Sequence, residues 1–382
     1  MPLKVLNEIC QMVGINPDLP VEECGDFEFS SIFTQVQKTI AGINDGQFET
    51  RLLYKNNHPW EFVISLPSSL PPEGKNKVYS SANIGIDTYY QQRLDKTRLD
   101  SSKTNITRTI KSMLNKAYRK QFHQEGDKHK ALENEKYKTW GELLTAYAHQ
   151  FEKGDTVAHL QDFYSGEPVT IKLDPRYTPI QNAQRYFKTY NKSRSTLKHL
   201  EKLMAKNQQD IDYLESILVL IKQAESMNEL DEIIEELEKE NYLKQHPKRK
   251  KQQQRSEPRR FVSSDGLEII VGRNNRQNDI LTLKQARGHD LWLHAKDIPG
   301  THVIVKLPPS LTSINDVPDK SLEEAANLAA YFSKAQESGK VPVDYTFRAN
   351  VRKPGGARPG MVIYDNYWTI MADPRDAKLD EK

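Results

Sequence analysis

The sequence predicts an α+β fold in which a long antiparallel two-helix coiled-coil arm carries a compact C-terminal α+β domain. One observation is a heptad pattern of apolar residues between positions 197 and 221, which is typical of a coiled-coil helix. A second is the alternation of short apolar runs and turn residues between positions 261 and 374, which is typical of strands. A third is polarity, because 37% hydrophobic residues and a mean hydropathy of −0.74 favour an elongated protein over one large globule.

Residues 1–86 are expected to form a small α+β segment. Helical spacing covers 3–13 and 31–43. The runs 48–54 and 60–66 are rich in β-branched and aromatic residues and are separated by turn-forming Asn and Pro, so they are predicted to pair as strands. Two helices and two strands bury little surface, and the segment is therefore interpreted as an incomplete domain.

Residues 87–243 are predicted to form the coiled-coil arm. A charged stretch without proline covers 87–151, and a second helix begins after Thr178 and Pro179, where proline favours a helix start. An extended hairpin-like connector is expected at 163–175. The heptad positions of the second helix are Leu197, Leu200, Met204, Asn207, Ile211, Leu214, Leu218 and Ile221.

The first helix must supply the facing seam of the arm. The pattern weakens around Gly126, where looser packing is expected. Charged positions on this helix (Lys111, Lys116, Arg119 and Lys120) are interpreted as a solvated face, with contact to RNA phosphates as the alternative. The candidate seam residues are Ile106, Ile110, Met113, Ala117, Trp140, Leu144, Tyr147 and Phe151.

Residues 244–260 are predicted to be a flexible basic linker, because they are poor in apolar residues and bracketed by prolines. A solvated tether and a phosphate-binding segment remain equally open interpretations. The cationic candidates are Lys248, Arg249, Lys250, Lys251, Arg259 and Arg260.

Residues 261–382 are predicted to form the C-terminal domain. Asp265 and Gly266 signal a hairpin turn between two apolar runs. Helices are expected at 278–287 and 322–336. The remaining strands are expected at 291–294, 302–307, 341–347, 361–364 and 367–371, and Trp292 and Trp368 are expected in the core.

A cluster of hydrogen-bond donors follows the strand that ends at Gly272, comprising Arg273, Asn274, Asn275, Arg276, Gln277 and Asn278. Guanidinium groups suit phosphate oxygens and carboxamides can read base edges, so the cluster is a candidate RNA-binding loop. The alternative is a plain turn in which Asn278 caps the next helix, and both interpretations can hold together.

A second set of candidate RNA-binding cations comprises Lys296, Arg352, Lys353 and Arg358, which stand in predicted loops. Glycines beside them, such as Gly355 and Gly356, let a backbone approach an anion closely. Tight structural turns are the comparable alternative.

The histidines allow a metalloenzyme hypothesis, in which His294 and His302 on successive strands act on RNA as metal ligands or acid/base groups. The sequence holds no His-Glu-x-x-His and no paired cysteine ligands. The expectation is therefore that the chain is not an enzyme and holds neither a metal nor a cofactor.

Several sequence blocks in order resemble the NFACT family. Those of its RNA-binding domain, NFACT-R, are 271–279, 290–294, 298–304, 341–346 and 351–360, and those of its middle domain are 137–144, 174–179 and 182–188. Residues 1–86 resemble the end of its N-terminal domain. In the family this N-terminal domain normally begins well upstream and carries an Asp-Arg pair tied to tRNA handling, and the resemblance implies that this upstream half is missing from the sequence.

The resemblance implies a ribosome-associated quality-control factor that binds tRNA, rRNA and the large ribosomal subunit obstructed by a peptidyl-tRNA. In bacteria, such factors support untemplated alanine tailing of the stalled chain. The tip of the arm is where a ribosomal protein, such as one at the stalk base, is expected to bind. The family is also described as fibronectin-binding protein A-like, so a fibronectin-binding surface adhesin is the alternative function.

A cytoplasmic location is expected from the sequence. The chain starts without a signal peptide, lacks an apolar run long enough for a membrane span, and shows no cell-wall anchor. Its two cysteines, Cys10 and Cys24, fit reduced thiols better than a disulfide framework.

Overall fold

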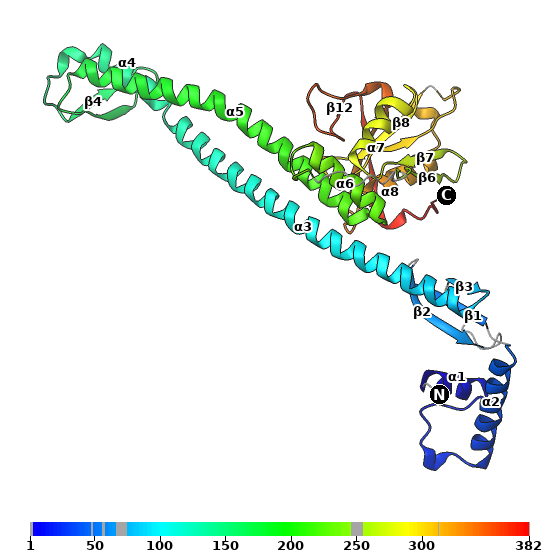
Figure 1. Cartoon of the computed structure of the whole chain (residues 1–382). Helices are drawn as coiled ribbons and strands as arrows, with labels where there is room; N and C mark the ends of the chain where they lie inside the picture. Colours follow the sequence, from blue (N-terminus) through cyan, green and yellow to red (C-terminus); the bar gives the residue numbers. More distant parts are fainter. Residues whose placement is uncertain are drawn as a thin grey trace. The chain divides into compact units, whose positions relative to one another are not determined.

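The computed structural model describes residues 3–46, 49–55, 58–65, 75–245, 255–311 and 313–381 (Figure 1). The chain divides into two units, Met1–Ser102 and Lys103–Lys382, and the long helix α3 (Ala82–Glu133) contributes to both. Among the described residues, no helix is long and apolar enough to cross a bilayer.

The first unit holds two helices and an antiparallel three-stranded sheet of order β2-β1-β3, besides the start of α3. The predicted strand pair is confirmed, and α2 begins earlier than predicted because Glu28 accepts a hydrogen bond from the Gly25 amide. Strand β3 was not predicted, since its sequence is dominated by Lys and Asn. The bounds are α1 Leu3–Met12, α2 Asp26–Asn44, β1 Glu49–Lys55, β2 His58–Ser65 and β3 Lys75–Tyr79.

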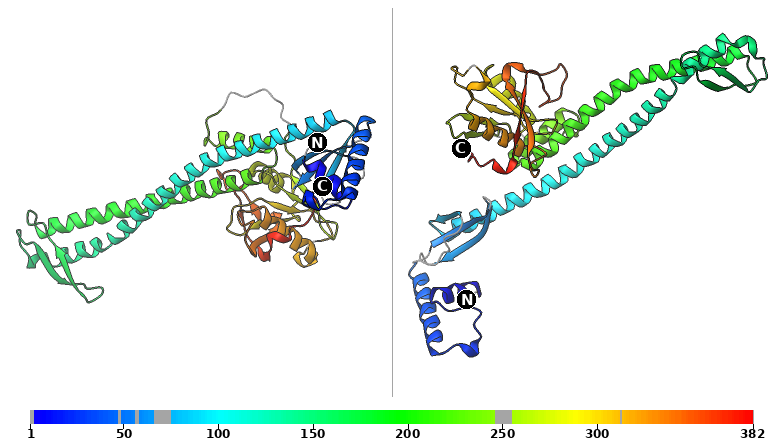
Figure 2. Two further views of the ribbon diagram at one scale, coloured as in Figure 1. Left: turned by 90° about the horizontal axis from the view of Figure 1, so that it is seen from below. Right: turned by 180° about the vertical axis from the view of Figure 1, so that it is seen from behind.

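The second unit contains the coiled-coil arm, in which α3 and α5 lie side by side and run antiparallel (Figure 2). Helix α5 starts as predicted, with Thr178 and Gln181 forming a reciprocal capping box and Pro179 in the first turn. Helix α3 continues through Gly126 without a break. The bounds beyond α3 are α4 Lys136–Ala146, β4 Val157–Gln161, β5 Pro168–Lys172, α5 Pro179–Gln223 and α6 Met227–Lys239.

The predicted heptad seam of α5 is confirmed, because all eight positions are buried or half-buried. Its one polar member, Asn207, is 2% exposed and donates from Nδ2 to the Ala117 carbonyl of α3 at 2.9 Å. Further polar contacts cross between the helices, such as Tyr118 Oη to Glu215 at 2.7 Å. A polar group that has its partner only in one alignment fixes the register of the two helices.

At the far end of the arm, α4 and the β4–β5 hairpin pack on the start of α5. Leu143, Leu144, Ala158 and Ile171 form the centre of this small core. The hairpin starts six residues before the predicted connector.

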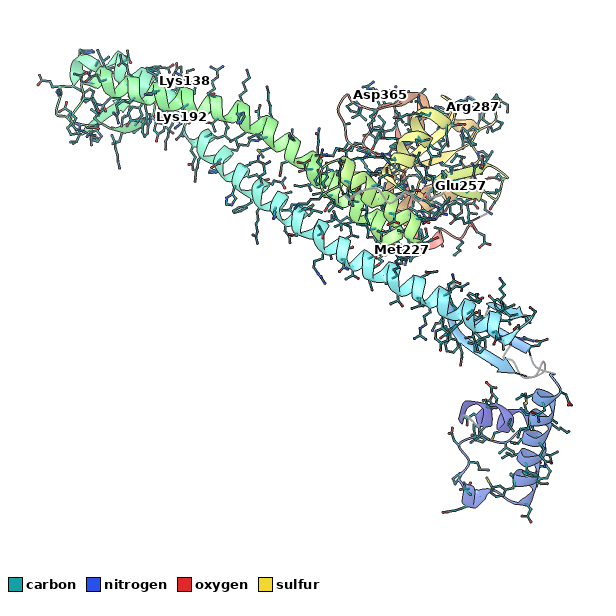
Figure 3. All side chains as sticks on the ribbon, viewed as in Figure 1. Lys138, Lys192, Met227, Glu257, Arg287 and Asp365 are labelled. Carbon is teal, nitrogen blue, oxygen red and sulfur yellow. The ribbon has the colours of Figure 1, made fainter. Side chains whose placement is uncertain are left out.

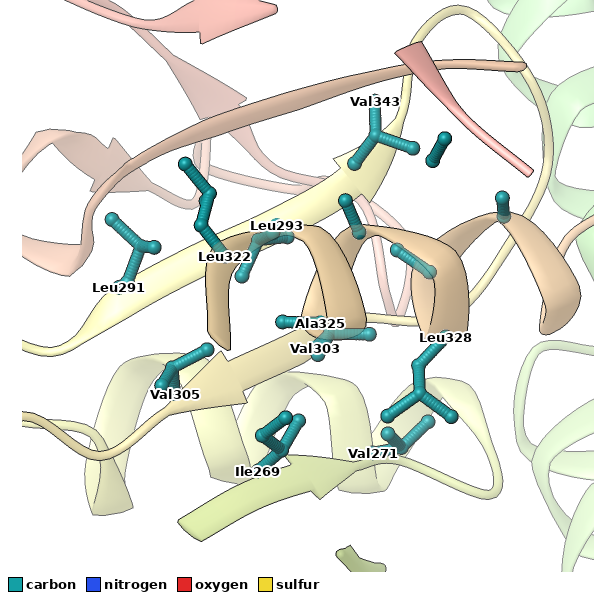
Figure 4. Packing of buried hydrophobic residues seen from close by; sticks show 14 of the residues in the cluster. Ile269, Val271, Leu291, Leu293, Val303, Val305, Leu322, Ala325, Leu328 and Val343 are labelled. Atoms are coloured by element: carbon teal, nitrogen blue, oxygen red, sulfur yellow. The ribbon is translucent and has the colours of Figure 1, made fainter. Parts of the chain in front are cut away.

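The C-terminal domain is built on a six-stranded antiparallel sheet of order β13-β10-β8-β9-β7-β6. Helix α8 covers one face, and the apolar core lies between α8 and the sheet (Figure 4). The segment predicted as a strand at 361–364 lies outside this sheet, because β12 pairs with β11. The bounds are β6 Arg259–Val262, β7 Glu268–Val271, α7 Asn275–Ile280, β8 Leu291–Ala295, β9 Val303–Val305, α8 Asp319–Tyr331, β10 Val341–Phe347, β11 Val351–Arg352, β12 Ile363–Tyr364 and β13 Trp368–Ala372.

Two sequence-based placements in this domain are wrong. Asn274 rather than Asn278 caps the short helix α7, accepting from the Gln277 amide at 2.9 Å. Trp292 is buried as expected, but Trp368 is 42% exposed because β13 is an edge strand of the sheet.

Candidate nucleic-acid interface

Arg273 is turned toward the middle domain. Its side chain is only 13% exposed and donates from Nη1 to Glu229 Oε1 at 3.1 Å. Its Nη2 donates to Glu381, and its Nε donates to the Glu257 carbonyl at 2.8 Å. Every nitrogen of this guanidinium thus has a partner within the chain.

Asn274 and Asn275, which follow Arg273, contact helix α6. Asn274 Nδ2 donates to Glu232 Oε2 at 2.7 Å, and Asn275 Nδ2 donates to Glu236 Oε1 at 3.1 Å. Asn278 is 1% exposed, and its Oδ1 accepts from Thr301 Oγ1 at 2.9 Å within the domain. These three side chains have structural partners and leave no base-reading edge at the surface.

Arg276 lies at the rim of this contact. Its Nη1 is 3.7 Å from Glu235 Oε2, and its side chain is 35% exposed. The long separation and partial exposure leave this guanidinium accessible to an additional anion.

Arg358 joins the domain to α5 and α6 from another loop. It donates from Nη2 to Asp210 Oδ1 at 2.5 Å and from Nη1 to Glu240 Oε2 at 2.9 Å. Its guanidinium lies over the rings of Tyr213 and Tyr242, at 5.4 and 4.7 Å from their centroids. Ion pairs and cation–π contacts together hold this side chain.

The acidic partners belong mainly to α6, whose six carboxylates are Glu229, Asp231, Glu232, Glu235, Glu236 and Glu238. Side chains fill the interval between α6 and the C-terminal domain (Figure 3). Burial raises the pKa of Glu236, which is 1% exposed and accepts from Tyr213 Oη at 2.9 Å. The predicted Arg/Asn loop therefore docks the C-terminal domain onto an acidic helix of its own chain.

Lys296, Arg352 and Lys353 remain nearer the surface. Arg352 is 68% exposed and pairs with exposed Asp365 at 3.2 Å. Lys296 Nζ lies 3.6 Å from Asp344 Oδ1 and 5.0 Å from the centroid of the Tyr367 ring.

Lys353 is 25% exposed and donates from Nζ to Asp279 Oδ2 at 2.5 Å. This contact ties the loop after β11 to α7. Lys353 is thus already paired with a carboxylate of its own domain, although its side chain still reaches solvent.

Exposed aromatic side chains accompany Lys296, and sequence reasoning missed them. Tyr367 is 45% exposed, and Trp368 is 42% exposed with its ring stacked on Tyr345 at 5.9 Å between centroids. The feature that explains their exposure is their position at the start of β13. This strand forms an edge of the sheet and has a neighbouring strand on one side only.

His294 and His302 do meet, with ring centroids 5.7 Å apart. Both nitrogens of His302 have hydrogen-bonding neighbours, namely Thr282 Oγ1 at 2.8 Å and the Gly360 carbonyl at 3.2 Å. Burial, followed by the neighbouring His294, lowers the pKa of His302 to about 3. His302 is therefore neutral near neutral pH, and both of its ring nitrogens have partners within the C-terminal domain.

A pocket of about 410 Å³ opens beside these histidines, between the C-terminal domain and α5. Trp292, His294 and Tyr364 contribute aromatic lining, and Asp297 contributes a carboxylate. Among the residues that the structure describes, no group of three His, Cys, Asp or Glu side chains has the arrangement of a metal site.

The predicted basic linker divides into two parts. Lys248, Arg249, Lys250 and Lys251 lie outside the described residues. Arg259 and Arg260 belong to strand β6, so the linker ends earlier than predicted. Arg259 is 1% exposed and donates from Nη2 to the Gln223 carbonyl at 3.1 Å, whereas Arg260 pairs with Glu268 at 2.5 Å.

Comparison with protein families matches both parts of the chain. A family model described as the NFACT N-terminal and middle domains matches residues 3–256. A model described as the NFACT protein RNA binding domain matches residues 258–366.

Curated relatives agree with this match. The Rqc2 homolog RqcH of Streptococcus suis (strain 05ZYH33) is 39% identical over 316 residues, which cover 82% of this chain and 56% of that protein. The Rqc2 homolog RqcH of Bacillus subtilis (strain 168) is 34% identical over 342 residues, which cover 88% of this chain and 58% of that protein. The chain thus spans little more than half the length of these relatives.

A solved structure is also similar. It is the C-terminal part of the fibronectin/fibrinogen-binding protein from Streptococcus suis, with a TM-score of 0.58 and 35% sequence identity, and the match covers 74% of this chain and 98% of that one. The extent of the family match and these identities lead to one conclusion: this chain belongs to the NFACT family and carries the family's RNA-binding domain.

Proposed function

We propose that the chain binds RNA of the large ribosomal subunit and acts in ribosome-associated quality control of stalled nascent chains. The observation that carries the proposal is the RNA-binding domain model, which matches residues 258–366 of a chain related to the RqcH proteins. The partners in this proposal are tRNA and rRNA, and the chain acts as a binding factor in the cytoplasm rather than as an enzyme.

The RNA contact of the C-terminal domain lies around Lys296, Tyr367 and Trp368, with Arg352 and Lys353 nearby. Exposed aromatic rings can stack on unpaired bases, and adjacent cations can bind the phosphates between them. Arg276 is a further candidate because it is partly exposed. Arg273, Asn274, Asn275, Asn278 and Arg358 would first have to leave their partners within the chain, so their part in RNA binding is indirect in this proposal.

The arm carries a second contact in this proposal. The small core of α4 and the β4–β5 hairpin forms an end that is separate from the C-terminal domain. A ribosomal protein, such as one at the stalk base, is the partner proposed for this end. Support for alanine tailing is proposed only for family members that are as long as the RqcH relatives.

Co-sedimentation with purified bacterial large ribosomal subunits tests the proposal. The wild-type chain should pellet with subunits obstructed by peptidyl-tRNA and be released as salt rises, because phosphate contacts weaken with ionic strength. The variant Tyr367→Ala/Trp368→Ala should pellet several-fold less well. A matched control is Phe27→Ala/Phe33→Ala, which removes two exposed aromatic rings from α2.

Two outcomes would count against the proposal. If the wild-type chain stays in the supernatant at low salt with every subunit preparation, the proposed ribosomal function is contradicted. A Tyr367→Ala/Trp368→Ala variant that pellets as well as the wild type would move the RNA contact away from β13.

Fibronectin binding is the second candidate function, and the similar Streptococcus suis structure is the observation that favours it. Exclusive exposure of the protein on intact cells, measured by surface labelling, would favour adhesion over the ribosomal proposal. Recovery with ribosomal particles after cell lysis and gradient separation would favour the ribosomal proposal.

A further inference from the structure

The charges of the middle domain are strongly segregated along the chain. Between Ser101 and Gln124, helix α3 contains no Asp or Glu, although the whole chain has 55 Lys+Arg against 52 Asp+Glu. The cations of this acid-free stretch are Lys103, Arg108, Lys111, Lys116, Arg119 and Lys120. Helix α6, by contrast, carries six carboxylates, and four of them contact the C-terminal domain, namely Glu229, Glu232, Glu235 and Glu236.

Five of these six cations line a single groove. The groove has a volume of about 880 Å³ and runs along α3, with Leu218, Ile221 and Lys222 of α5 on its other side. Among the described residues that line it, none is acidic. From Lys103 to Arg119 the α3 wall is roughly 24 Å long, at about 1.5 Å per helical residue.

The cations of the groove differ from those of the C-terminal domain in their partners. Arg108, Lys111, Lys116 and Arg119 form no ion pair with any residue that the structure describes, and all four are exposed. Arg273 and Arg358, by contrast, are held by carboxylates of the chain itself. An unpaired cation keeps its full attraction for an external anion, whereas a paired one must first give up its partner.

We infer that this α3 groove binds the sugar–phosphate backbone of RNA, and this inference rests on the proposed function of the chain as an RNA-binding protein. Several cations in a row along one rigid helix match a chain of regularly spaced phosphates. Thr107, Ser112 and Asn115 lie between the cations and add neutral donors and acceptors, which suit phosphate and 2′-hydroxyl oxygens.

An acidic protein is the competing occupant, and the lining of the groove disfavours it. Protein interfaces depend on buried aromatic and apolar anchors at their centre. The groove offers only Leu218 and Ile221 as apolar lining and no aromatic side chain among its described residues. A polar, cationic track that fixes position without pockets for side chains is typical of backbone recognition in nucleic acids.

The test compares two triple variants of the full chain with equal loss of charge. The groove variant is Lys111→Gln/Lys116→Gln/Arg119→Gln. The control is Lys198→Gln/Lys202→Gln/Lys206→Gln, at exposed positions of α5 that do not line the groove. Glutamine favours helices nearly as well as lysine and arginine, and circular dichroism verifies that both variants retain their helical content.

Binding is measured by fluorescence anisotropy with a labelled 20-nucleotide oligouridine, a 20-base-pair RNA duplex and poly-L-glutamate, over a range of salt concentrations. The inference predicts that the groove variant binds at least one RNA about tenfold or more weakly. It also predicts a salt dependence shallower by about three in log–log slope, one for each lost phosphate contact, with a smaller effect in the control.

The other outcomes separate this inference from the proposed function. If the wild type binds RNA and the groove variant binds it equally well, the groove inference is overturned while the proposed function stands. If only poly-L-glutamate binding falls, the groove is a site for an acidic protein and the RNA inference is overturned. If the wild-type chain binds neither RNA nor ribosomal subunits, the proposed function and the groove inference are both overturned.

Discussion

Arg273 of the C-terminal domain and Glu229 of helix α6 form an ion pair of 3.1 Å, although the two residues stand 44 positions apart in the sequence. The pair is largely shielded from water, with side chains 13% and 8% exposed. The same carboxylate also accepts from the Glu225 amide at 3.0 Å and so fixes the turn between α5 and α6. One interaction thus connects the start of α6 to the loop between β7 and α7 of the RNA-binding domain.

Removal of Arg358 should loosen the C-terminal domain from the arm. Arg358→Ala loses the hydrogen bonds to Asp210 and Glu240 and the stacking on two tyrosine rings, and it leaves carboxylates without their partner. The free energy of unfolding should fall by about 2–3 kcal/mol, as expected for a partly buried ion pair. Urea denaturation and hydrogen exchange of the α5–α6 region measure the effect.

Arg352→Ala is the matched control, because it removes an arginine from the same domain whose ion pair is exposed. Its effect on stability should be about 0–1 kcal/mol. Equal destabilisation by the two variants would contradict the assigned docking role of Arg358.

The polar seam position of the arm should determine its register. Asn207→Asp replaces the amide donor with a carboxylate facing the Ala117 carbonyl, and it should lower the free energy of unfolding by about 2–4 kcal/mol. Asn207→Leu should instead raise it by about 1 kcal/mol while the two helices become less strictly aligned. Thermal denaturation measures the stability of both variants, and distances between spin labels on α3 and α5 report the alignment of the helices. A single alignment in Asn207→Leu would contradict the role of Asn207 in fixing the register.

Two glycines in the arm helices should respond oppositely to alanine. Gly126 lies exposed in α3 with nothing within 4 Å of an added Cβ, so Gly126→Ala should stabilise the protein by about 0.5–1 kcal/mol. In α4, a Cβ at Gly141 would stand 2.8 Å from the Phe187 ring, so Gly141→Ala should destabilise the protein by about 1–3 kcal/mol. Thermal melts of the two variants give the comparison, and a neutral Gly141→Ala would mean that the Phe187 contact is not close.

Acidification should destabilise the fold partly through His302. Its pKa is about 3 in the folded protein against an ordinary value of 6.5, so the unfolded chain takes up the proton first. The contribution of neutral His302 to the free energy of unfolding is complete above pH 6.5 and is lost as pH falls toward 3. The loss between pH 7.5 and 5.5 amounts to about 1 kcal/mol.

His302→Gln tests this pH dependence, because glutamine can still donate to the Gly360 carbonyl and accept from Thr282 but does not titrate. Urea denaturation of both proteins at the two pH values gives the difference. The variant should lose less stability than the wild type on acidification, and an identical loss would show that His302 is not the group responsible.

Local signals predicted much of the fold. The heptad spacing of α5, the Thr178–Pro179 helix start and the Asp265–Gly266 turn depend on residues within a few positions of one another, and each is confirmed. Strand β3 and the β11–β12 pair were misjudged because short strands take their pairing from distant partners. Trp368 was misjudged because exposure depends on the place of a strand in its sheet.

The site was harder to predict from the sequence than the fold. Arg273 and Arg358 have the residue type of RNA ligands, but their carboxylate partners lie 44 and 148 positions away and could not be identified along the chain. The acid-free stretch of α3 was visible as a local run of like charges. Which of its cations line one groove depends on the packing of α5, which the heptad pattern alone does not give.

Lysine reactivity distinguishes two roles of the cations: the exposed cations of α3 bind RNA, whereas Arg273 and Arg358 hold the C-terminal domain to the arm. The chain is acylated alone and in complex with bacterial large ribosomal subunits, and each modified lysine is quantified by mass spectrometry. Lys111 and Lys116 should become several-fold less reactive in the complex, while Lys198, Lys202 and Lys206 should keep their reactivity. A chain that binds the subunit with Lys111 and Lys116 as reactive as in solution would contradict it.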